Sequence, residues 1–162
     1  MSEKEFQQLI SDNKSAIWRL CRLYAQDGEG SKDLFQDVLI QIWRALPSFR
    51  EESRLETWIY RITVNTGIRY VLKMKKYDRH LSLEEFDIQV RELSQENKED
   101  YEALYLCIAR LNELDRTITG LYLEDLPYKE IADVLGITEN NVGVKISRIK
   151  KSLAACIGKV MR

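Results

Sequence analysis

The chain has 162 residues, with 25 Lys and Arg against 26 Asp and Glu, so its formal net charge is −1. Its one histidine, His80, stands in a polar stretch without neighbouring ligand types, and Cys21, Cys107 and Cys156 are widely spaced. This composition argues against a catalytic or metal centre, and it predicts buried free thiols in a reducing cytosol. With no bilayer-length apolar run and no signal-peptide pattern, we expect a cytoplasmic protein without membrane insertion, metal or cofactor.

The near-zero net charge hides a division of the chain into three parts. Residues 1–76 carry 13 basic and 10 acidic residues, which gives a net charge of +3. Residues 77–125 carry 5 and 13, for −8, and residues 126–162 carry 7 and 3, for +4. Two basic segments therefore flank an acidic one, and each basic segment suits a nucleic-acid partner better than the average suggests.

The first half of the chain is expected to form three helices, because Gly and Pro are scarce and apolar residues recur at helical spacing. The first helix spans about residues 3–24 and ends at a turn over residues 27–30. Ser31 is the expected N-cap of a second helix, which Pro47 ends. A third helix is expected over about residues 54–76.

The second half is expected to begin with a flexible linker over residues 77–98, where charges are mixed and helical periodicity is weak. A second helical module then occupies residues 99–162. The predicted fold class is therefore all-α, with two small modules, residues 1–76 and 99–162, joined by that linker.

Residues 128–153 have the pattern of a helix-turn-helix. Ala132 is a small residue where two helices cross, Gly136 suits the sharp turn, and Thr138 suits the N-cap of the second helix. The free face of that helix is mainly polar and basic: Asn140, Asn141, Lys145, Ser147, Arg148 and Lys151. The alternative is an ordinary helical hairpin with a solvated basic face.

Two polar stripes stand out in the first module. The second helix carries one at spacings of four, four and three residues: Asp33, Asp37, Gln41 and Arg44. Its remaining faces, Trp43 included, form a wide apolar arc that predicts heavy packing. The third helix carries a cationic stripe with Trp58 beside it: Arg61, Asn65, Arg69 and Lys73. Cations displace phosphate counterions and an aromatic ring can stack on a base, although Trp58 in the core and a solvated stripe stay an alternative.

These segments resemble a bacterial sigma factor of the extracytoplasmic-function (ECF) class. The stretch DLFQDVLIQIWRALPSFREESRLETWIYRITVNTGIRYVLK is similar to region two of that family, and ARLNELDRTITGLYLEDLPYKEIADVLGITENNVGVKISRIKKSL to region four. The resemblance implies a non-catalytic partner of core RNA polymerase, bound through the β′ clamp helices and the β flap, which recognises promoter DNA. It also implies control by an anti-sigma factor.

The resemblance also implies a role for each surface. Polymerase binding falls on Asp33, Gln36, Asp37 and Gln41. Recognition of the −10 element falls on the third helix and on the loop over residues 47–53, which corresponds to a loop that captures a flipped base: Phe49, Arg50, Trp58, Arg61, Asn65, Arg69 and Lys73. Recognition of the −35 element falls on the helix that starts at Thr138.

The chain departs from the family pattern at several of these positions. Arg69 replaces a common acidic residue, and Gly67 stands where Ala is usual. Asn141 stands where Thr is frequent, and Gly143 and Val144 replace polar or basic residues. We therefore expect −35 readout from Ser147, Arg148 and Lys145.

Two other functions are considered. A free-standing helix-turn-helix regulator would bind twofold operators as a dimer, but it would not need the second nucleic-acid surface of the first module. A nuclease could use Glu51, Glu52 and Glu56 with a metal, but these carboxylates lack supporting ligands and a solvated turn explains them better.

Overall fold

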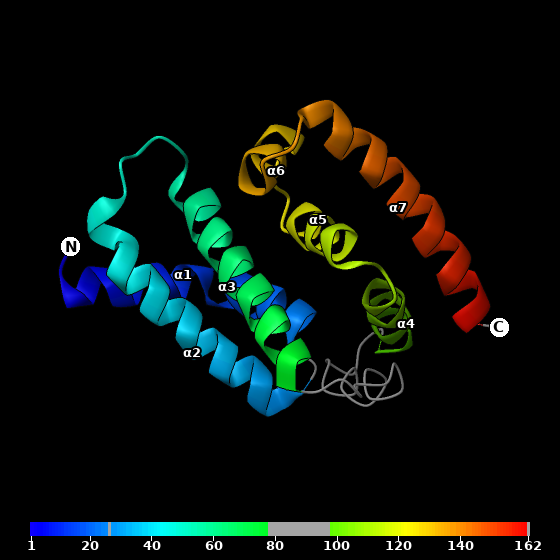
Figure 1. Cartoon of the computed structure of the whole chain (residues 1–162), viewed down its shortest axis with the longest axis horizontal. Coiled ribbons are helices and arrows are strands. Elements are labelled where there is room, and N and C mark those ends of the chain that lie inside the picture. The colour runs from blue at the N-terminus through cyan, green and yellow to red at the C-terminus, as the bar shows by residue number, and fades with distance from the viewer. Residues whose placement is uncertain (26, 78–97, 162) are drawn as a thin grey trace. The chain divides into compact units, whose positions relative to one another are not determined.

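The structure, a computed structural model, describes residues 1–25, 27–77 and 98–161, and all of its regular elements are helices (Figure 1). The described residues divide into two compact units, one holding α1, α2, η1 and α3 and the other holding α4 to α7. The all-α prediction is confirmed. The predicted linker lies outside the described residues, except for Tyr77 and Lys98, which belong to α3 and α4.

The N-terminal unit is a bundle of α1 (Glu3–Tyr24), α2 (Gly28–Ala45) and α3 (Leu55–Tyr77), with the short 3₁₀ helix η1 (Leu46–Ser48) after α2. Each of the three long helices packs against the other two. Their contact faces supply the largest buried side chains: Ile17, Leu20, Leu34, Val38, Ile42, Ile59 and Val64. The opposite faces of α2 and α3 are left to solvent, which fixes where binding surfaces can form.

The start of α2 differs from the prediction. The helix begins at Gly28, and its N-cap is Asp27, whose carboxylate accepts a hydrogen bond from the backbone N–H of Gly30. Ser31, the predicted cap, is buried, and its Oγ donates to the carbonyl oxygen of Ala25 at 3.1 Å. A carboxylate at a helix N-terminus also interacts favourably with the helix dipole, so Asp27 can cap a first turn that contains two glycines.

Gly67 of α3 lies against the ring of Tyr24, the last residue of α1. A Cβ atom at this position would lie 2.6 Å from Cε2 and 2.7 Å from Cγ of Tyr24. Tyr24 is only 2% exposed, so its ring occupies the space that any larger residue would need. Glycine therefore stands at this position, where the family usually has Ala, because the buried ring of Tyr24 leaves no room for a side chain.

The C-terminal unit consists of α4 (Lys98–Ala109), α5 (Glu113–Leu123), α6 (Tyr128–Leu135) and α7 (Glu139–Val160). The long helix α7 packs against the other three. The core of the unit combines Val142, Ile146 and Ile149 of α7 with buried residues of the other three helices: Ile108, Ile118, Leu121 and Ile131.

The prediction of three free thiols is wrong for two of the cysteines. Cys107 of α4 is disulfide-bonded to Cys156 of α7, and their Cα atoms are 5.8 Å apart. The two residues are 49 positions apart in sequence, and only the packing of α4 against α7 brings them together. Cys21 is free and buried, and desolvation by burial raises its pKa to about 12.

Candidate nucleic-acid interface

The outer face of α2 presents the residues assigned to polymerase binding. Asp33, Gln36 and Asp37 are exposed, and Gln41 is half-buried. The amide Nε2 of Gln41 donates to Oδ1 of Asp37 at 3.3 Å, so two of the four side chains are already joined. The face is thus rich in hydrogen-bond acceptors, which suits a basic partner surface.

Two large apolar side chains interrupt this acidic face. Ile40 and Trp43 are each 48% exposed. They lie four and seven residues after Gln36, which is the spacing of one helix face. The predicted heavy packing of Trp43 is wrong, because nearly half of the residue is exposed. Its described ring contact is with Phe6 at the start of α1, where the ring centroids are 4.8 Å apart. Exposed apolar residues within a polar surround are typical of a protein interface.

The outer face of α3 presents the predicted cationic stripe: Arg61, Asn65, Arg69 and Lys73. Asn65, Arg69 and Lys73 are exposed and Arg61 is half-buried, whereas Ile59 and Val64 on the other side are in the core. Leu72, 54% exposed, lies in the same stripe and was not among the predicted site residues, which are charged, polar or aromatic.

An aromatic pair stands at the start of α3. The rings of Phe49, from the loop after η1, and Trp58 have centroids 5.0 Å apart and planes inclined by 51°. Both residues are half-buried, and Arg50 beside Phe49 is exposed. Trp58 is therefore not a fully buried core residue, and the structure brings it together with the loop predicted to act with it.

The helix-turn-helix has the local geometry that its turn chemistry predicts. Gly136 adopts left-handed φ and ψ angles of 69° and 31°, which an L side chain rarely adopts. Thr138 caps α7, because its Oγ1 accepts a hydrogen bond from the backbone N–H of Asn141 at 3.1 Å. Ala132 and Val142 are buried where the two helices meet. Short-range interactions thus set the direction of α7 relative to α6.

Most of the predicted −35 residues lie on the exposed side of α7: Asn140, Asn141, Ser147, Arg148 and Lys151. Lys145 is different. Its side chain is 29% exposed, and its Nζ lies 3.8 Å from Oδ1 of Asp115 on α5. Lys150 is exposed, with its Nζ 4.8 Å from the ring centroid of Tyr122, and a hydrogen bond to Tyr122 raises the pKa of Lys150.

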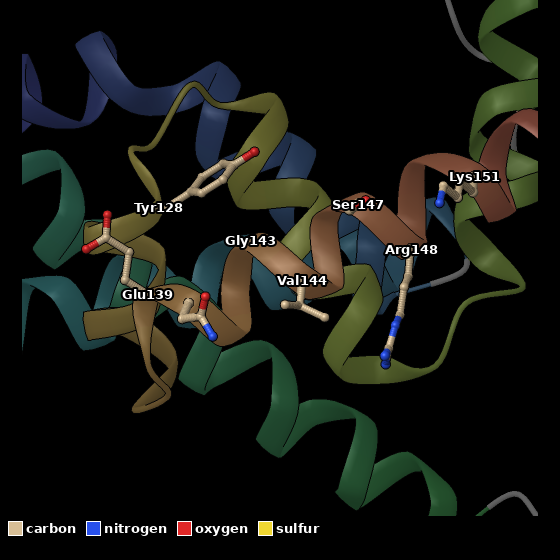
Figure 2. A pocket seen from close by; sticks show the side chains of 8 residues that line it. Tyr128, Glu139, Gly143, Val144, Ser147, Arg148 and Lys151 are labelled. Atoms are coloured by element: carbon tan, nitrogen blue, oxygen red, sulfur yellow. The ribbon is translucent and has the colours of Figure 1, made fainter.

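An open hollow runs along the exposed side of α7 (Figure 2). Its lining includes Tyr128 at the start of α6 and, from α7, Asn140, Gly143, Val144, Ser147 and Arg148. Tyr128 and Val144 were not among the predicted site residues. In the sequence, each is an apolar or aromatic residue on the polar side of its helix. That placement can be recognised only once the buried face of the helix is known.

The described residues hold no cluster of three or more His, Cys, Asp and Glu side chains that could bind a metal. Glu51 and Glu52, from the nuclease hypothesis, are exposed in the loop before α3, and Glu56 is exposed in its first turn. Within the same parts of the chain, no helix combines the length and apolar character needed to cross a membrane.

Comparisons with known proteins assign both units. The family model for Sigma-70 region 2 matches residues 9–77, and that for Sigma-70, region 4 matches residues 101–153. RNA polymerase sigma factor SigV of Bacillus subtilis (strain 168) is 27% identical over 146 residues, covering 88% of this chain and 84% of SigV. The ECF RNA polymerase sigma-E factor of Escherichia coli (strain K12) is 27% identical over 164 residues, covering 93% and 85%.

Solved structures share the fold. The sigma factor RpoE of Bartonella quintana, in complex with the anti-sigma factor NepR, matches with a TM-score of 0.78 and 20% identity, over 96% of this chain and 98% of that one. CnrH, in complex with the cytosolic domain of CnrY, matches with a TM-score of 0.73 and 18% identity, over 98% and 90%. With region 2 in its first unit, region 4 in its second and relatives that it matches along most of their length, the chain belongs to the ECF class of RNA polymerase sigma factors.

Proposed function

We propose that this sigma factor directs core RNA polymerase to its promoters through three faces, one each on α2, α3 and α7. The observation that carries the proposal is the presence of two separate surfaces suited to nucleic acid, the cationic stripe of α3 and the exposed side of α7. A free-standing regulator needs only the second surface. A protein that opens one promoter element and reads another in duplex form needs both.

The α2 face binds the polymerase, with the β′ clamp helices as its expected partner. Ile40 and Trp43 supply exposed apolar area on this face, and Asp33 and Asp37 supply charge beside it. Tryptophan is enriched among residues that dominate binding energy, and it acts best where polar neighbours exclude water. The combination supports tight binding to a partner surface that has both basic and apolar groups.

The α3 face acts on the −10 element. Arg61, Arg69 and Lys73 contact phosphates, and Asn65 can hydrogen-bond a base edge. Removing a base from the stack costs a few kcal/mol, and stacking on an aromatic ring returns about 1–3 kcal/mol per base. Phe49 and Trp58 provide such rings beside the stripe. This pairing supports strand opening without any catalytic residue.

The exposed side of α7 reads the −35 element in the major groove, where a recognition helix fits. Arg148 is the residue best suited to a guanine, because its guanidinium can donate two hydrogen bonds to O6 and N7. Asn140 suits an adenine, because its amide N–H can donate to N7 while its amide oxygen accepts from the N6 amino group. Lys151 lies one turn beyond Ser147 and suits a phosphate.

A cytoplasmic anti-sigma factor is the expected inhibitor. The solved relative RpoE is bound to the anti-sigma factor NepR. In this chain, an inhibitor that covers Ile40 and Trp43 would compete directly with the polymerase for the same apolar area.

In vitro transcription with core polymerase and a promoter library tests the function. The full chain should yield transcripts from a defined set of promoters, and core polymerase alone should not. A chain that binds duplex DNA tightly as a dimer and supports no transcription would instead be a free-standing regulator.

A further inference from the structure

The buried residues of α7 define which of its side chains lie furthest from the core. Val142, Ile146 and Ile149 are each no more than 5% exposed and face inward. At 100° per residue, Val144 lies almost directly opposite their mean direction. It is 41% exposed, which is unusual for a valine in a packed helix. Val144 therefore lies on the line of α7 furthest from the core, here called the crest, which is the part of a recognition helix that enters the major groove.

The neighbours of Val144 on that crest are polar. Asn140 precedes it by four residues, and Ser147 and Arg148 follow it by three and four, so all of them share one face. Figure 2 shows Val144 and Arg148 projecting to the same side of α7, next to Gly143, which has no side chain. The crest is thus an apolar side chain bounded by hydrogen-bonding groups.

Lys145, one residue further along, is held on the flank of the helix. Its Nζ lies 3.8 Å from Oδ1 of Asp115, and the two side chains are 29% and 23% exposed. To reach a base, Lys145 would have to leave Oδ1 of Asp115, a buried oxygen that has no hydrogen-bond partner, whereas Oδ2 accepts from Nδ2 of Asn112 at 3.2 Å. Lys145 is therefore a positioning residue that ties α7 to α5.

We propose that Val144 reads the C5-methyl group of a thymine in the −35 element, and that Lys145 contributes no base selectivity. The inference rests on the proposed function of α7. In the major groove, thymine is the base that presents a methyl group, and an apolar side chain is its complement. The thymine lies close to the base that Arg148 contacts, because Val144 and Arg148 are one helical turn apart.

The test begins with the preferred −35 element, selected from a library by transcription with the holoenzyme. Each thymine of that element is then replaced in turn by deoxyuridine, which differs only in lacking the methyl group. At one thymine, promoter binding by the holoenzyme should fall about fourfold, the value expected for one buried methyl group. With Val144→Ala, thymine and uracil should bind equally well at that position.

The control variants separate a contact from a structural effect. Val144→Ala should fold normally, since alanine is the better helix former at an exposed position. Val160→Ala makes the same change at the other end of α7 and should retain the fourfold difference. Lys145→Ala should weaken binding to every promoter alike and leave the selected bases unchanged.

Two results would overturn the inference while leaving the proposed function intact. One is a selected −35 element that contains no thymine, or one in which uracil can replace each thymine without loss of promoter binding. The other is a change of selected base with Lys145→Ala but not with Val144→Ala. Failure of the proposed function looks different, because no promoter in the library would then be transcribed.

Discussion

Replacing Gly67 with alanine should destabilise the N-terminal unit, although alanine is the better helix former. In an exposed helix interior the substitution gains about 1 kcal/mol, because glycine loses more backbone entropy on folding. At Gly67 the new methyl group would meet the ring of Tyr24, 2.6 Å from Cε2. Ordinary contact begins at 3.4 Å and Cδ2 of the ring lies closer still, so the ring or the helix would have to move by more than about 0.8 Å.

The magnitude follows from how little room Tyr24 has. Its side chain is 2% exposed, so it cannot swing into solvent without losing its packing. Overpacking a filled core costs about 1–3 kcal/mol, and a clash with a rigid ring belongs at the upper end of that range. After the helix gain is subtracted, the net loss of unfolding free energy should be about 1–2 kcal/mol. For a unit of this size each kcal/mol lowers the Tm by about 4–8 °C.

Tryptophan fluorescence can follow this unit alone, because Trp18, Trp43 and Trp58 all belong to it. Thermal and urea unfolding of Gly67→Ala should show an earlier fluorescence transition than the parent. Gly143→Ala is the matched control: its Cβ atom would lie 3.8 Å from Tyr128, an ordinary contact. It should stabilise the C-terminal unit by about 0.5–1 kcal/mol, visible by circular dichroism, and leave the fluorescence transition in place.

A double-mutant cycle with Tyr24→Leu separates the clash from other effects. With the ring gone, alanine at Gly67 should cost much less than it does in the parent, so the two substitutions should couple favourably. A rise in the fluorescence Tm of Gly67→Ala would refute the reasoning, since it would show that the space above Gly67 is not filled by Tyr24.

Four further predictions concern the binding faces and the cysteines. Asp37→Lys should weaken binding of core polymerase by more than tenfold without changing the fluorescence Tm, because buried charge pairs at interfaces are worth about 2 kcal/mol or more; equal binding would remove the α2 face from the interface. Trp58→Ala should leave promoter binding in the closed complex but reduce permanganate reactivity of the −10 thymines, whereas normal opening with reduced stability would make Trp58 structural. Cys156→Ser should destabilise the C-terminal unit by up to about 4 kcal/mol, the chain-entropy value for a loop closed over 49 positions, as measured by circular dichroism against the oxidised parent. Cys21, with its pKa raised to about 12, should resist alkylation by iodoacetamide in the folded protein at pH 8 and react once urea exposes it, since an unburied thiol titrates near 8.5.

Local signals predicted the helix-turn-helix and missed features that depend on distant residues. Gly136 and Thr138 act on their immediate neighbours, so their types alone indicate the turn and the cap. Periodicity places Lys145 near the free side of α7, and the sequence therefore predicts that it reads bases. Its partner Asp115 lies 30 positions earlier, on another helix, and only the packing of α5 against α7 brings them within 3.8 Å.

The cap of α2 shows a different limit, in which two residues compete for one role. Asp27 and Ser31 are both good N-caps, and the Gly28–Glu29–Gly30 segment between them has poor helix propensity. Sequence reasoning favours the later cap for that reason. In the structure Asp27 is the N-cap, and Ser31 is buried, where its hydroxyl donates a hydrogen bond to the carbonyl oxygen of Ala25. A buried polar contact thus decided between two local solutions of similar quality.

The exposure of Trp43 connects stability to regulation. With 48% of its surface exposed, Trp43 contributes less to the stability of the N-terminal unit than the packed tryptophan that the pattern predicted. Its position beside Ile40 on the acidic face makes sense if a partner covers both. The polymerase and an inhibitor would then need the same apolar area, and competition for it would silence the protein without any contact to α3 or α7. Trp43→Ala should accordingly weaken the binding of both core polymerase and the inhibitor. The promoter preference of the holoenzyme that still forms should be unchanged.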